Sequence, residues 1–297
     1  MVTIVDAGAA LERCLAGLSA QAAAPEMEIL VPWDDTVPGI SALAAKHPGV
    51  RFLSLGKVPT QRDAKGPAGQ HELFDRRRAA GLAAATGDLI AIVEDRGVPR
   101  PDWARILSAL HERMPNAVIG GAIDHARDAT LNWAVYFCDF GRYQSPFAAG
   151  PRDYVSDVNI CYKRRAIDDT RELWRERYHE TTVHWALQKQ GEVLYLTPEF
   201  AVDQMRDGLT LSGCLSERIG WGRLFAYTRS RELSLVKRLV LAAASPLLPF
   251  VLFLRHLRGR LERHKDLGAF TRAAPATFLL LAAWSLGELL GYLTARP

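Results

Sequence analysis

The sequence predicts an α/β fold, in which a mostly parallel, Rossmann-like sheet is flanked by helices and followed by hydrophobic C-terminal helices. Three observations predict it. Short apolar runs alternate with runs at helical spacing through the first half of the 297 residues. Acidic residues directly follow several of the apolar runs, and the last 60 residues are both apolar and basic. Alternating strands and helices form right-handed crossovers, which give a mainly parallel sheet.

The predicted strands of the first half are short apolar runs that end at polar or turn residues. They cover residues 2–5, 27–33, 51–55, 89–94 and 117–123. Between them, apolar residues at positions i, i+3 and i+4 predict helices. These helices cover residues 9–21, 39–46, 75–85 and 101–114. Residues 57–70 are rich in glycine, proline and charge, which predicts a loop.

The middle of the chain is less regular. Residues 131–147 are aromatic and are predicted to form a loop or an irregular helix. Apolar patterning and turn residues predict further elements downstream. These are a strand at residues 157–163, a helix at 178–190, a strand at 192–197 closed by Pro198, and a helix at 212–231.

Acidic residues lie where three of the predicted strands end. They are Asp6 after the first strand, Asp34 and Asp35 after the second, and Glu94 and Asp95 at the fourth. Ligands of open α/β sheets bind beyond the carboxyl ends of the strands. A carboxylate buried at such an end is costly unless it faces a ligand or an ion. This edge of the sheet is therefore the predicted functional site.

Composition limits the class of protein. Residues 229–297 hold 11 Lys and Arg against 4 Asp and Glu, and they are also apolar, which favours an anionic membrane surface over nucleic acid as a partner. The four widely spaced cysteines predict neither a disulfide framework nor a zinc site. The N-terminal residues do not resemble a signal peptide, so the soluble part is expected in the cytosol. The sequence has no Walker loop and no Gly-x-Gly-x-x-Gly after the first strand, which counts against an NTPase or a nicotinamide enzyme.

Two hydrophobic segments are predicted near the C-terminus. Residues 239–254 are 16 positions without a charge, interrupted by Pro246 and Pro249. Residues 273–294 are 22 positions with one charge, Glu288. A spanning helix needs about 20 apolar residues, so only the second segment is long enough. Basic flanks on both sides of the first segment favour a re-entrant hairpin or an interfacial helix, and a buried helical pair in a soluble protein is the alternative.

Six short motifs follow one another along the first 200 residues. The opening strand and helix come first, and Asp34-Asp35-Thr36 follows the second strand. A helix and turn, Arg78-Ala79-Ala80-Gly81 to Gly87-Asp88, precedes Glu94-Asp95-Arg96-x-x-Pro99. Asp157-Val158-Asn159-Ile160-Cys161-Tyr162-Lys163-Arg164 and His179-Glu180 complete the series. In this order the motifs resemble those of family 2 glycosyltransferases, which have the GT-A fold.

The resemblance implies a role for each motif. It implies Glu180 as the base of an inverting transfer, because His179-Glu180 is similar to the family's Glu-Asp pair. It implies donor-binding roles for Asp34, Asp35, Arg78, Asp95 and Arg96. On the acceptor side it implies Asp157, Asn159 and His179, and the resemblance of a later segment to Gln-x-x-Arg-Trp adds Arg218 and Trp221. Alternatives remain open: a helix-start acid for Glu180, a solvated turn for Asp34-Asp35, and an interfacial helix with snorkelling arginines around Arg218.

One motif departs from the family in a way that bears on the metal. The family has Asp-x-Asp where this chain has Glu94-Asp95-Arg96, and the resemblance implies Glu94 and Asp95 as ligands of Mn²⁺ or Mg²⁺. An arginine cannot ligate a cation. Either Glu94 and Asp95 hold the ion together with the diphosphate, or Arg96 itself pairs with the diphosphate in bidentate fashion. Arg96 therefore puts metal dependence in doubt.

The sequence as a whole predicts a hexosyl-type glycosyltransferase at the cytoplasmic face of the inner membrane. The donor is expected to be a nucleotide-diphosphate sugar, UDP-linked, and the acceptor a lipid or lipid-linked glycan. The expected organisation is a transferase domain at 1–210, an amphipathic interfacial helix at 211–234 and hydrophobic membrane-associated helices at 235–297. One alternative is an inactive GT-A module that binds nucleotide or scaffolds a membrane complex. A nucleotidyltransferase is another, but residues 6–10 contain a single glycine and no basic residue, which counts against it.

Overall fold

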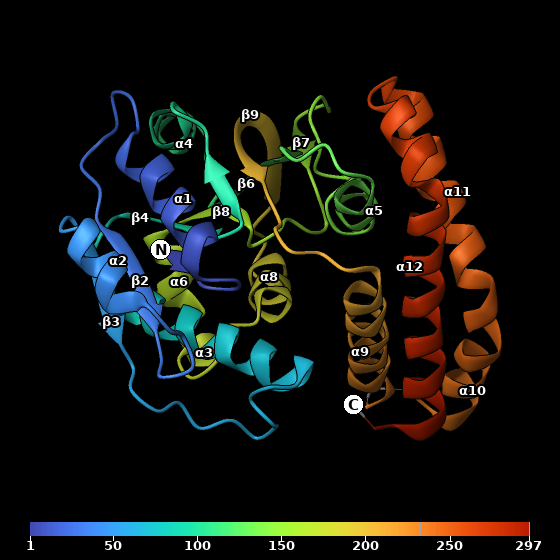
Figure 1. The fold of residues 1–297 in the computed structure, drawn as a ribbon. Helices are drawn as coiled ribbons and strands as arrows, with labels where there is room; N and C mark the ends of the chain where they lie inside the picture. The colour runs from blue at the N-terminus through green and yellow to red at the C-terminus, as the bar shows by residue number, and fades with distance from the viewer. Residues whose placement is uncertain (232, 297) are drawn as a thin grey trace. The chain divides into compact units, whose positions relative to one another are not determined.

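The computed structural model describes residues 1–231 and 233–296. The chain divides into two compact units. Unit 1 comprises Met1–Gln61, His71–Ala126 and Tyr143–Met205. Unit 2 comprises Arg62–Gln70, Arg127–Arg142 and Arg206–Pro297. The helices that dominate unit 2 are orange to red in Figure 1, and the sheet belongs to unit 1.

A central sheet organises unit 1. Within the described residues it has seven strands in the order β1-β4-β8-β6-β9-β5, with β7 paired to β9. Their bounds are β1 Val2–Thr3, β4 Leu89–Glu94, β5 Gly97–Pro99, β6 Val118–His125, β7 Gly150–Pro151, β8 Asn159–Lys163 and β9 Leu194–Gln204. A separate parallel pair joins β2 Ile29–Trp33 and β3 Val50–Ser54.

The long strands of this sheet run mostly in one direction. β1 is parallel to β4, and β6 is parallel to β9. β8 is antiparallel to both of its neighbours, β4 and β6, so β1, β4, β6 and β9 share one direction. The predicted fold class, a mostly parallel sheet flanked by helices, is confirmed. The antiparallel β8 brings residues from before its start to the edge where β4 ends.

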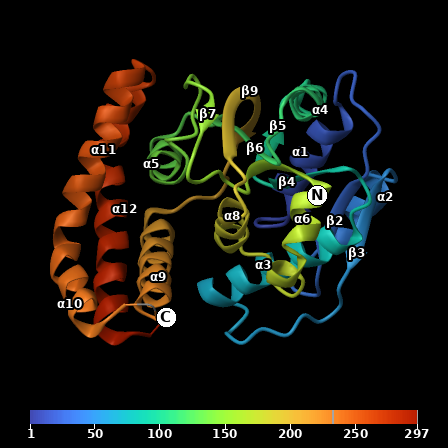
Figure 2. The same ribbon diagram turned by 180° about the vertical axis from the view of Figure 1, so that it is seen from behind.

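Helices flank the sheet in both views of unit 1 (Figures 1 and 2). Their bounds are α1 Gly8–Ser19, α2 Ile40–Lys46, α3 Pro67–Ala84, α4 Trp103–Arg113, α6 Arg164–Asp169, α7 Arg171–Trp174 and α8 Glu180–Lys189. α1 buries Leu11, Cys14, Leu15 and Leu18, the same apolar positions that predicted it. This i, i+3, i+4, i+7 face is what packs an amphipathic helix onto a sheet.

Three elements differ from the sequence-based expectations. α3 begins at Pro67, inside the predicted loop, because proline is well tolerated in the first turn of a helix. The aromatic segment 131–147 contains a regular helix, α5 Thr130–Asp139. β9 continues past Pro198 to Gln204 because its register against β6 shifts between Gly120 and Ala122, and a proline without a ladder partner is accommodated in such an irregularity.

Unit 2 is helical, and two of its helices pack at close range. Besides α5 it contains α9 Leu211–Ser230, α10 Leu235–Ala244, the short 3₁₀ turn η1 Ser245–Leu247, α11 Leu248–Arg263 and α12 Leu267–Thr294. A Cβ atom at Gly222 of α9 would collide with the backbone of Trp284, and one at Gly287 of α12 would collide with the backbone of Ile219. Gly291 likewise faces the backbone of α9. The Gly-x-x-x-Gly spacing on α12 is typical of helices that pack tightly in membranes.

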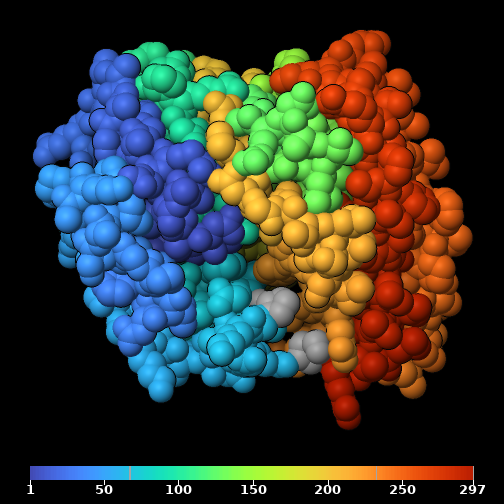
Figure 3. All heavy atoms as spheres, in the orientation of Figure 1, coloured from blue at the N-terminus to red at the C-terminus, as the bar shows by residue number. Residues whose placement is uncertain are grey.

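Two helical stretches of unit 2 are long and apolar enough to cross a membrane: Leu235–Arg263 with 29 residues, and Leu267–Thr294 with 28. The expectation that the first segment is too short is therefore wrong. Helical backbone continues through η1 into α11, and Pro246 and Pro249 lie near the starts of η1 and α11, where proline is tolerated. These helices form the orange and red surface in Figure 3.

The first stretch carries a row of exposed apolar side chains. Large hydrophobic residues along α10, η1 and α11 are about half exposed or more, and they are Leu235, Val236, Leu239, Val240, Leu247, Phe250, Val251 and Leu254. Their exposed fractions reach 71% at Val236. A contiguous apolar face of this kind is typical of a surface that contacts lipid or protein.

The close packing of α9 and α12 predicts the effect of one substitution. Gly287→Leu is expected to lower the stability of unit 2 by about 1–3 kcal/mol, because the new side chain forces two backbones apart. Gly268→Leu, on the same helix, is the matched control, since a Cβ there meets no atom within 4 Å. Thermal unfolding of the full chain in a neutral detergent compares the two variants. Equal melting temperatures would contradict the predicted contact.

Candidate active site

The end of β4 is tied to the loop that follows β1. Asp95 is 1% exposed, and its carboxylate accepts the backbone N–H groups of Val5 at 3.0 Å, Asp6 at 3.0 Å and Ala7 at 2.7 Å. Ala7 has φ of 59°, a left-handed conformation that turns its N–H inward and is rare without glycine. Burial raises the pKa of Asp95 to about 6, although the N–H groups of Ala7 and Val5 oppose this rise. Three donors on one carboxylate make Asp95 a structural centre of this edge.

Arg96 lies beside the same loop. Its guanidinium contacts the carboxylate of Asp6 through two atoms, with Nε at 2.8 Å and Nη2 at 2.5 Å from the two oxygens. The side chain of Arg96 is 16% exposed and that of Asp6 is 32% exposed, so the pair is accessible to water. Paired guanidinium and carboxylate groups of this geometry give the strongest ionic hydrogen bonds.

Arg78 of α3 lies at the centre of the acidic residues. Its Nη2 is 3.1 Å from Oε1 of Glu94 and 2.7 Å from Oδ2 of Asp157, while Nε donates to Oγ1 of Thr3 at 3.1 Å. Asp75, one turn earlier on α3, is 3.9 Å from Nη1. The four partners come from β4, the segment before β8, β1 and α3 itself. One buried guanidinium therefore joins four parts of unit 1.

Glu180 belongs to the same electrostatic cluster. It is the first residue of α8 and is half-buried. Burial opposes the charge of Arg78, but the carboxylates of Asp157, Glu94 and Glu180 together raise the pKa of this arginine above its ordinary value. Glu180 also contributes to the raised pKa of His71, although burial opposes that rise and Asp75 is the main cause of it. Glu94 and Asp157 thus contact Arg78 directly, and the charge of Glu180 acts on the same guanidinium.

The cluster holds more acid than base, and Glu94 shows the effect. Burial and the neighbouring charge of Asp157 raise the pKa of Glu94 to about 7, although Arg78 and Arg96 oppose the rise. A carboxyl group with a pKa near neutrality is typical of functional sites. This excess of negative charge around one arginine is the most unusual electrostatic feature of unit 1.

Asp34 and Asp35 have different surroundings. Asp34 is fully buried, and its Oδ2 accepts the Nε–H of Arg77 at 2.5 Å while Oδ1 accepts the N–H of Thr36 at 2.9 Å. Burial works to raise the pKa of Asp34, but these bonds from Arg77 and Thr36 win and lower it. Asp35 is exposed, at the end of β2. Asp34 thus fixes the β2 end to α3, and Asp35 is available to a ligand.

Asn159 is buried, as Asp34 is, whereas His179 is exposed, as Asp35 is. Asn159, at the start of β8, is 1% exposed, and its amide accepts the Nε1–H of Trp103 and donates to the carbonyl of Ala122, both at 2.8 Å. Its side chain therefore joins β8 to α4 and β6. His179 is exposed, immediately before α8, with its ring centroid 6.1 Å from that of His71.

The sequence analysis missed several residues that build this site. Arg77 and Asp75 lie beside Arg78 on α3. The signal that could have predicted them is the run of four charged residues Asp75-Arg76-Arg77-Arg78 within a predicted helix. Tyr162 was seen only as part of a motif. Its hydroxyl lies 2.6 Å from that of Tyr178 and 2.8 Å from Nε2 of His184, which supports the segment that leads into α8.

Arg218 and Trp221 lie on α9, in unit 2. Arg218 is 7% exposed, and both of its terminal nitrogens contact the carboxylate of Asp139 at 2.6 Å. Trp221 is half-buried on the same helix. The pair Arg218–Asp139 fastens α9 to the end of α5. Their acceptor-side roles remain predictions.

The side chains of the predicted metal site do not fit a resident cation in this arrangement. Asp95 is engaged by three N–H groups, Glu94 contacts Arg78, and Arg96 pairs with Asp6. Among residues 1–231 and 233–296, no three His, Cys, Asp or Glu side chains are arranged as a metal site.

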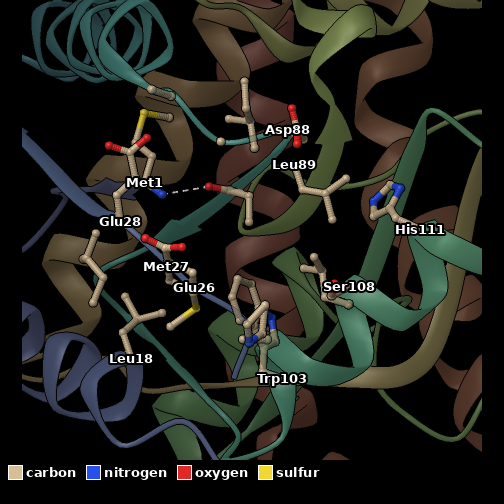
Figure 4. Close-up of a pocket in the computed structure, with 18 of the residues that line it drawn as sticks. Met1, Leu18, Glu26, Met27, Glu28, Asp88, Leu89, Trp103, Ser108 and His111 are labelled. Carbon is tan, nitrogen blue, oxygen red and sulfur yellow. Dashed lines mark hydrogen bonds between the residues drawn. The ribbon is translucent and has the colours of Figure 1, made fainter. Parts of the chain in front are cut away.

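A large cavity lies elsewhere in unit 1. It has a volume of about 480 Å³ and is lined by the first residues of β2 and β4, together with Met1, Trp103 and His111 (Figure 4). The amino group of Met1 donates to the carbonyl of Ala91 at 2.8 Å, which is the bond drawn in the figure. Because strands begin here, this cavity is at the edge opposite to Glu94 and Asp95. The predicted site residues do not line it.

The chain was found to resemble known proteins in structure but not in sequence. No family of known sequences matches the chain, and no curated protein matches it by sequence. Among solved structures, the chain is similar to the mannosyltransferase PcManGT from Pyrobaculum calidifontis, solved in complex with GDP-Man and Mn²⁺. The identity is 14%, the match covers 99% of this chain and 73% of the other, and the TM-score is 0.46.

The carboxylate of Asp95 is predicted to be needed for stability. Asp95→Ala leaves three buried N–H groups without an acceptor and is expected to cost about 3 kcal/mol. Asp35→Ala removes an exposed acid at a nearby strand end and is expected to change stability by about 0.5 kcal/mol or less. Urea unfolding followed by circular dichroism measures both. A loss at Asp95 no larger than at Asp35 would reject the structural role.

Glu94 predicts a pH dependence. Its pKa is 4.5 ordinarily and about 7 in the folded chain, so between these values the folded state holds a proton that the unfolded state has lost. The contribution of Glu94 is therefore fully present below pH 4.5, and it is lost as pH rises through about 7. Glu94→Gln mimics the protonated form and is expected to gain on the order of 1–3 kcal/mol over the natural chain at pH 8, but not at pH 4.5. Unfolding curves at both pH values test this, and a constant difference would contradict it.

Proposed function

We propose that this chain is an inverting glycosyltransferase of the hexosyl type, which takes its sugar from a nucleotide diphosphate, UDP in the first instance. The observation that carries the proposal is the convergence of Glu94, Asp157 and Glu180 on Arg78. These acids are far apart in the sequence, and each belongs to one of the motifs that resemble those of family 2 glycosyltransferases. The glycosyltransferase likeness of fold agrees with the same class.

Glu180 is the proposed base. In a single displacement it takes the proton of an acceptor hydroxyl as that oxygen attacks the anomeric carbon, while the bond from this carbon to the phosphate oxygen breaks and the diphosphate leaves. Glu180 is half-buried at the start of α8, so one face of its carboxylate is accessible. The exposed His179 beside it and Asp157 are the proposed acceptor-side groups. Asn159 acts through packing, since both ends of its amide are bonded.

The donor is proposed to bind where β1, β2 and β4 end. Asp35 is exposed there and offers carboxylate oxygens to the base or ribose, whereas the buried Asp34 holds the strand end in place. Arg96 is the proposed partner of the diphosphate. Its accessible ion pair with Asp6 shows that the guanidinium already presents two donors to an anion, and a diphosphate exchanging with Asp6 keeps this geometry. Asp95 and Arg78 keep the loop and the acids in position.

The acceptor is proposed to be a lipid or lipid-linked glycan at the cytoplasmic face of the inner membrane. The exposed apolar row from Leu235 to Leu254 and the two helices of spanning length support a membrane location. The excess of Lys and Arg in residues 229–297 supports the cytoplasmic side, where positive charge is retained.

A second candidate is an inactive module that binds nucleotide or scaffolds a membrane complex. Two observations favour it: Arg96 stands at a ligand position of the family motif, and the oxygens of Asp95 are taken up by N–H groups. Calorimetry with UDP and a turnover screen of nucleotide sugars, with manganese and with EDTA, separate the two candidates. Binding without turnover in every condition would favour the inactive module.

The proposal predicts the kinetics of one variant. Glu180→Gln is expected to lower kcat by about 10²-fold or more, because general base catalysis contributes on that order. Its affinity for the nucleotide is expected to stay within about twofold, since Glu180 is placed on the acceptor side. Glu176→Gln, an exposed acid four residues earlier, is the matched control and should retain activity. Turnover preserved in Glu180→Gln, with affinity lost, would reject Glu180 as the base.

A further inference from the structure

A second cavity lies within unit 2 and has a different character. Its volume is about 710 Å³, and its walls come from α5, α9, α11 and α12 together with the residues that follow α5. In Figures 1 and 2, α5 and α11 both lie beside α12. This cavity is built only from unit 2 and contains none of the residues around Arg78.

The walls of this cavity are strongly basic. Six arginines line it, and they are Arg142, Arg218, Arg255, Arg258, Arg260 and Arg263. The acidic residues in the lining are Asp139 and Glu262, so positive charge exceeds negative by four. Asp139 contacts Arg218 at 2.6 Å, and Glu262 contacts Arg258 at 2.7 Å. The acids are thereby neutralised, and the net charge that remains favours an anion.

The basic wall is held rigidly. Arg260 is 3% exposed, donates to the carbonyl oxygen of Gly141 and lies over the ring of Phe137 at 5.4 Å. Arg263 donates to the same carbonyl at 2.9 Å and to that of Arg142 at 3.0 Å. These carbonyl oxygens hold both guanidinium groups in position. Charges positioned in advance bind an anion at a lower entropic cost.

The remaining wall is apolar, and its position matches a membrane boundary. Leu252, Leu280, Leu281 and Trp284 also line the cavity. Along α11 the exposed apolar row ends at Leu254 and the basic residues begin at Arg255, with one exposed leucine, Leu261, among them. A change from apolar to basic side chains marks the level of lipid headgroups, where Arg and Lys meet phosphate. The cavity thus joins an anion site to an apolar wall at that level.

We infer that this cavity binds the phosphate group of a membrane lipid, with the adjoining part of its hydrocarbon chain against the apolar wall. Arginine forks bind phosphate oxygens in bidentate fashion, and at the level of the lipid headgroups phosphate is the anion that they meet. The inference concerns a separate site and does not rest on sugar transfer, so it stands or falls independently of the proposed function.

Calorimetry on the full chain in a neutral detergent tests it. The probes are a short-chain phosphatidic acid, a short-chain phosphatidylcholine and inorganic phosphate. Phosphatidic acid is expected to bind at least tenfold more tightly than either of the others. Inorganic phosphate binding as tightly as the lipid would show that the site takes free anions and would overturn the lipid assignment. Equal binding of phosphatidylcholine, whose phosphodiester charge is balanced by the choline cation, would show that the basic cavity does not select an anionic lipid and would overturn the inference.

Three variants locate the site. Arg255→Gln removes one charge from an exposed position of the wall, and Gly259→Leu fills space without changing charge, since a Cβ at this lining residue meets no atom within 4 Å. Each is expected to weaken phosphatidic acid binding by about tenfold. Lys237→Gln removes an exposed charge from α10, outside the cavity, and is expected to change binding by about twofold or less. Equal losses in Lys237→Gln and Arg255→Gln, or unchanged binding in Gly259→Leu, would overturn the site.

Discussion

The buried guanidinium of Arg78 is the contact on which the candidate active site depends. It is surrounded by carboxylates from β4, α3 and the segment before β8, and the charge of Glu180 acts on it from α8. Without this cation the acids would repel one another in a site shielded from water. With it, the acids are held close together but remain incompletely neutralised. Burial and the neighbouring charge of Asp157 therefore raise the pKa of Glu94 to about 7. A site with surplus negative charge is prepared to receive a proton or a cationic transition state.

Much of the fold follows from local patterns. The buried face of α1 follows the apolar spacing of the sequence, and the strand β4 has the predicted bounds. Both are predictable because the side chains that contact the rest of unit 1 recur at the period of a helix or of a strand. Three features depend on contacts that the local pattern does not contain. The direction of β8 is set by its two neighbours, β9 passes Pro198 by a shift of register, and the path from α10 to α11 stays helical because each proline falls near a helix start.

The residues of the candidate site were named from strand ends and motifs, and their roles stay predictions. Glu94 was expected at the end of a strand, whereas Asp157 and Glu180 came from the resemblance of their motifs. What the sequence did not contain was the set of partners. Asp95 looked like a ligand residue, yet the loop after β1 folds three N–H groups onto it because Ala7 adopts a left-handed conformation. Asp34 likewise is bound to Arg77, a contact that spans 43 residues.

The glycine contacts of unit 2 have a mechanical consequence. With no side chains between their backbones at Gly222, Gly287 and Gly291, α9 and α12 cannot slide past each other by a turn without a steric clash. A displacement of α12 must therefore carry α9 with it, and the Arg218–Asp139 ion pair passes the movement on to α5. The three helices thus move as one stiff body, so a force that acts on α12 is transmitted to α5 rather than absorbed within the bundle.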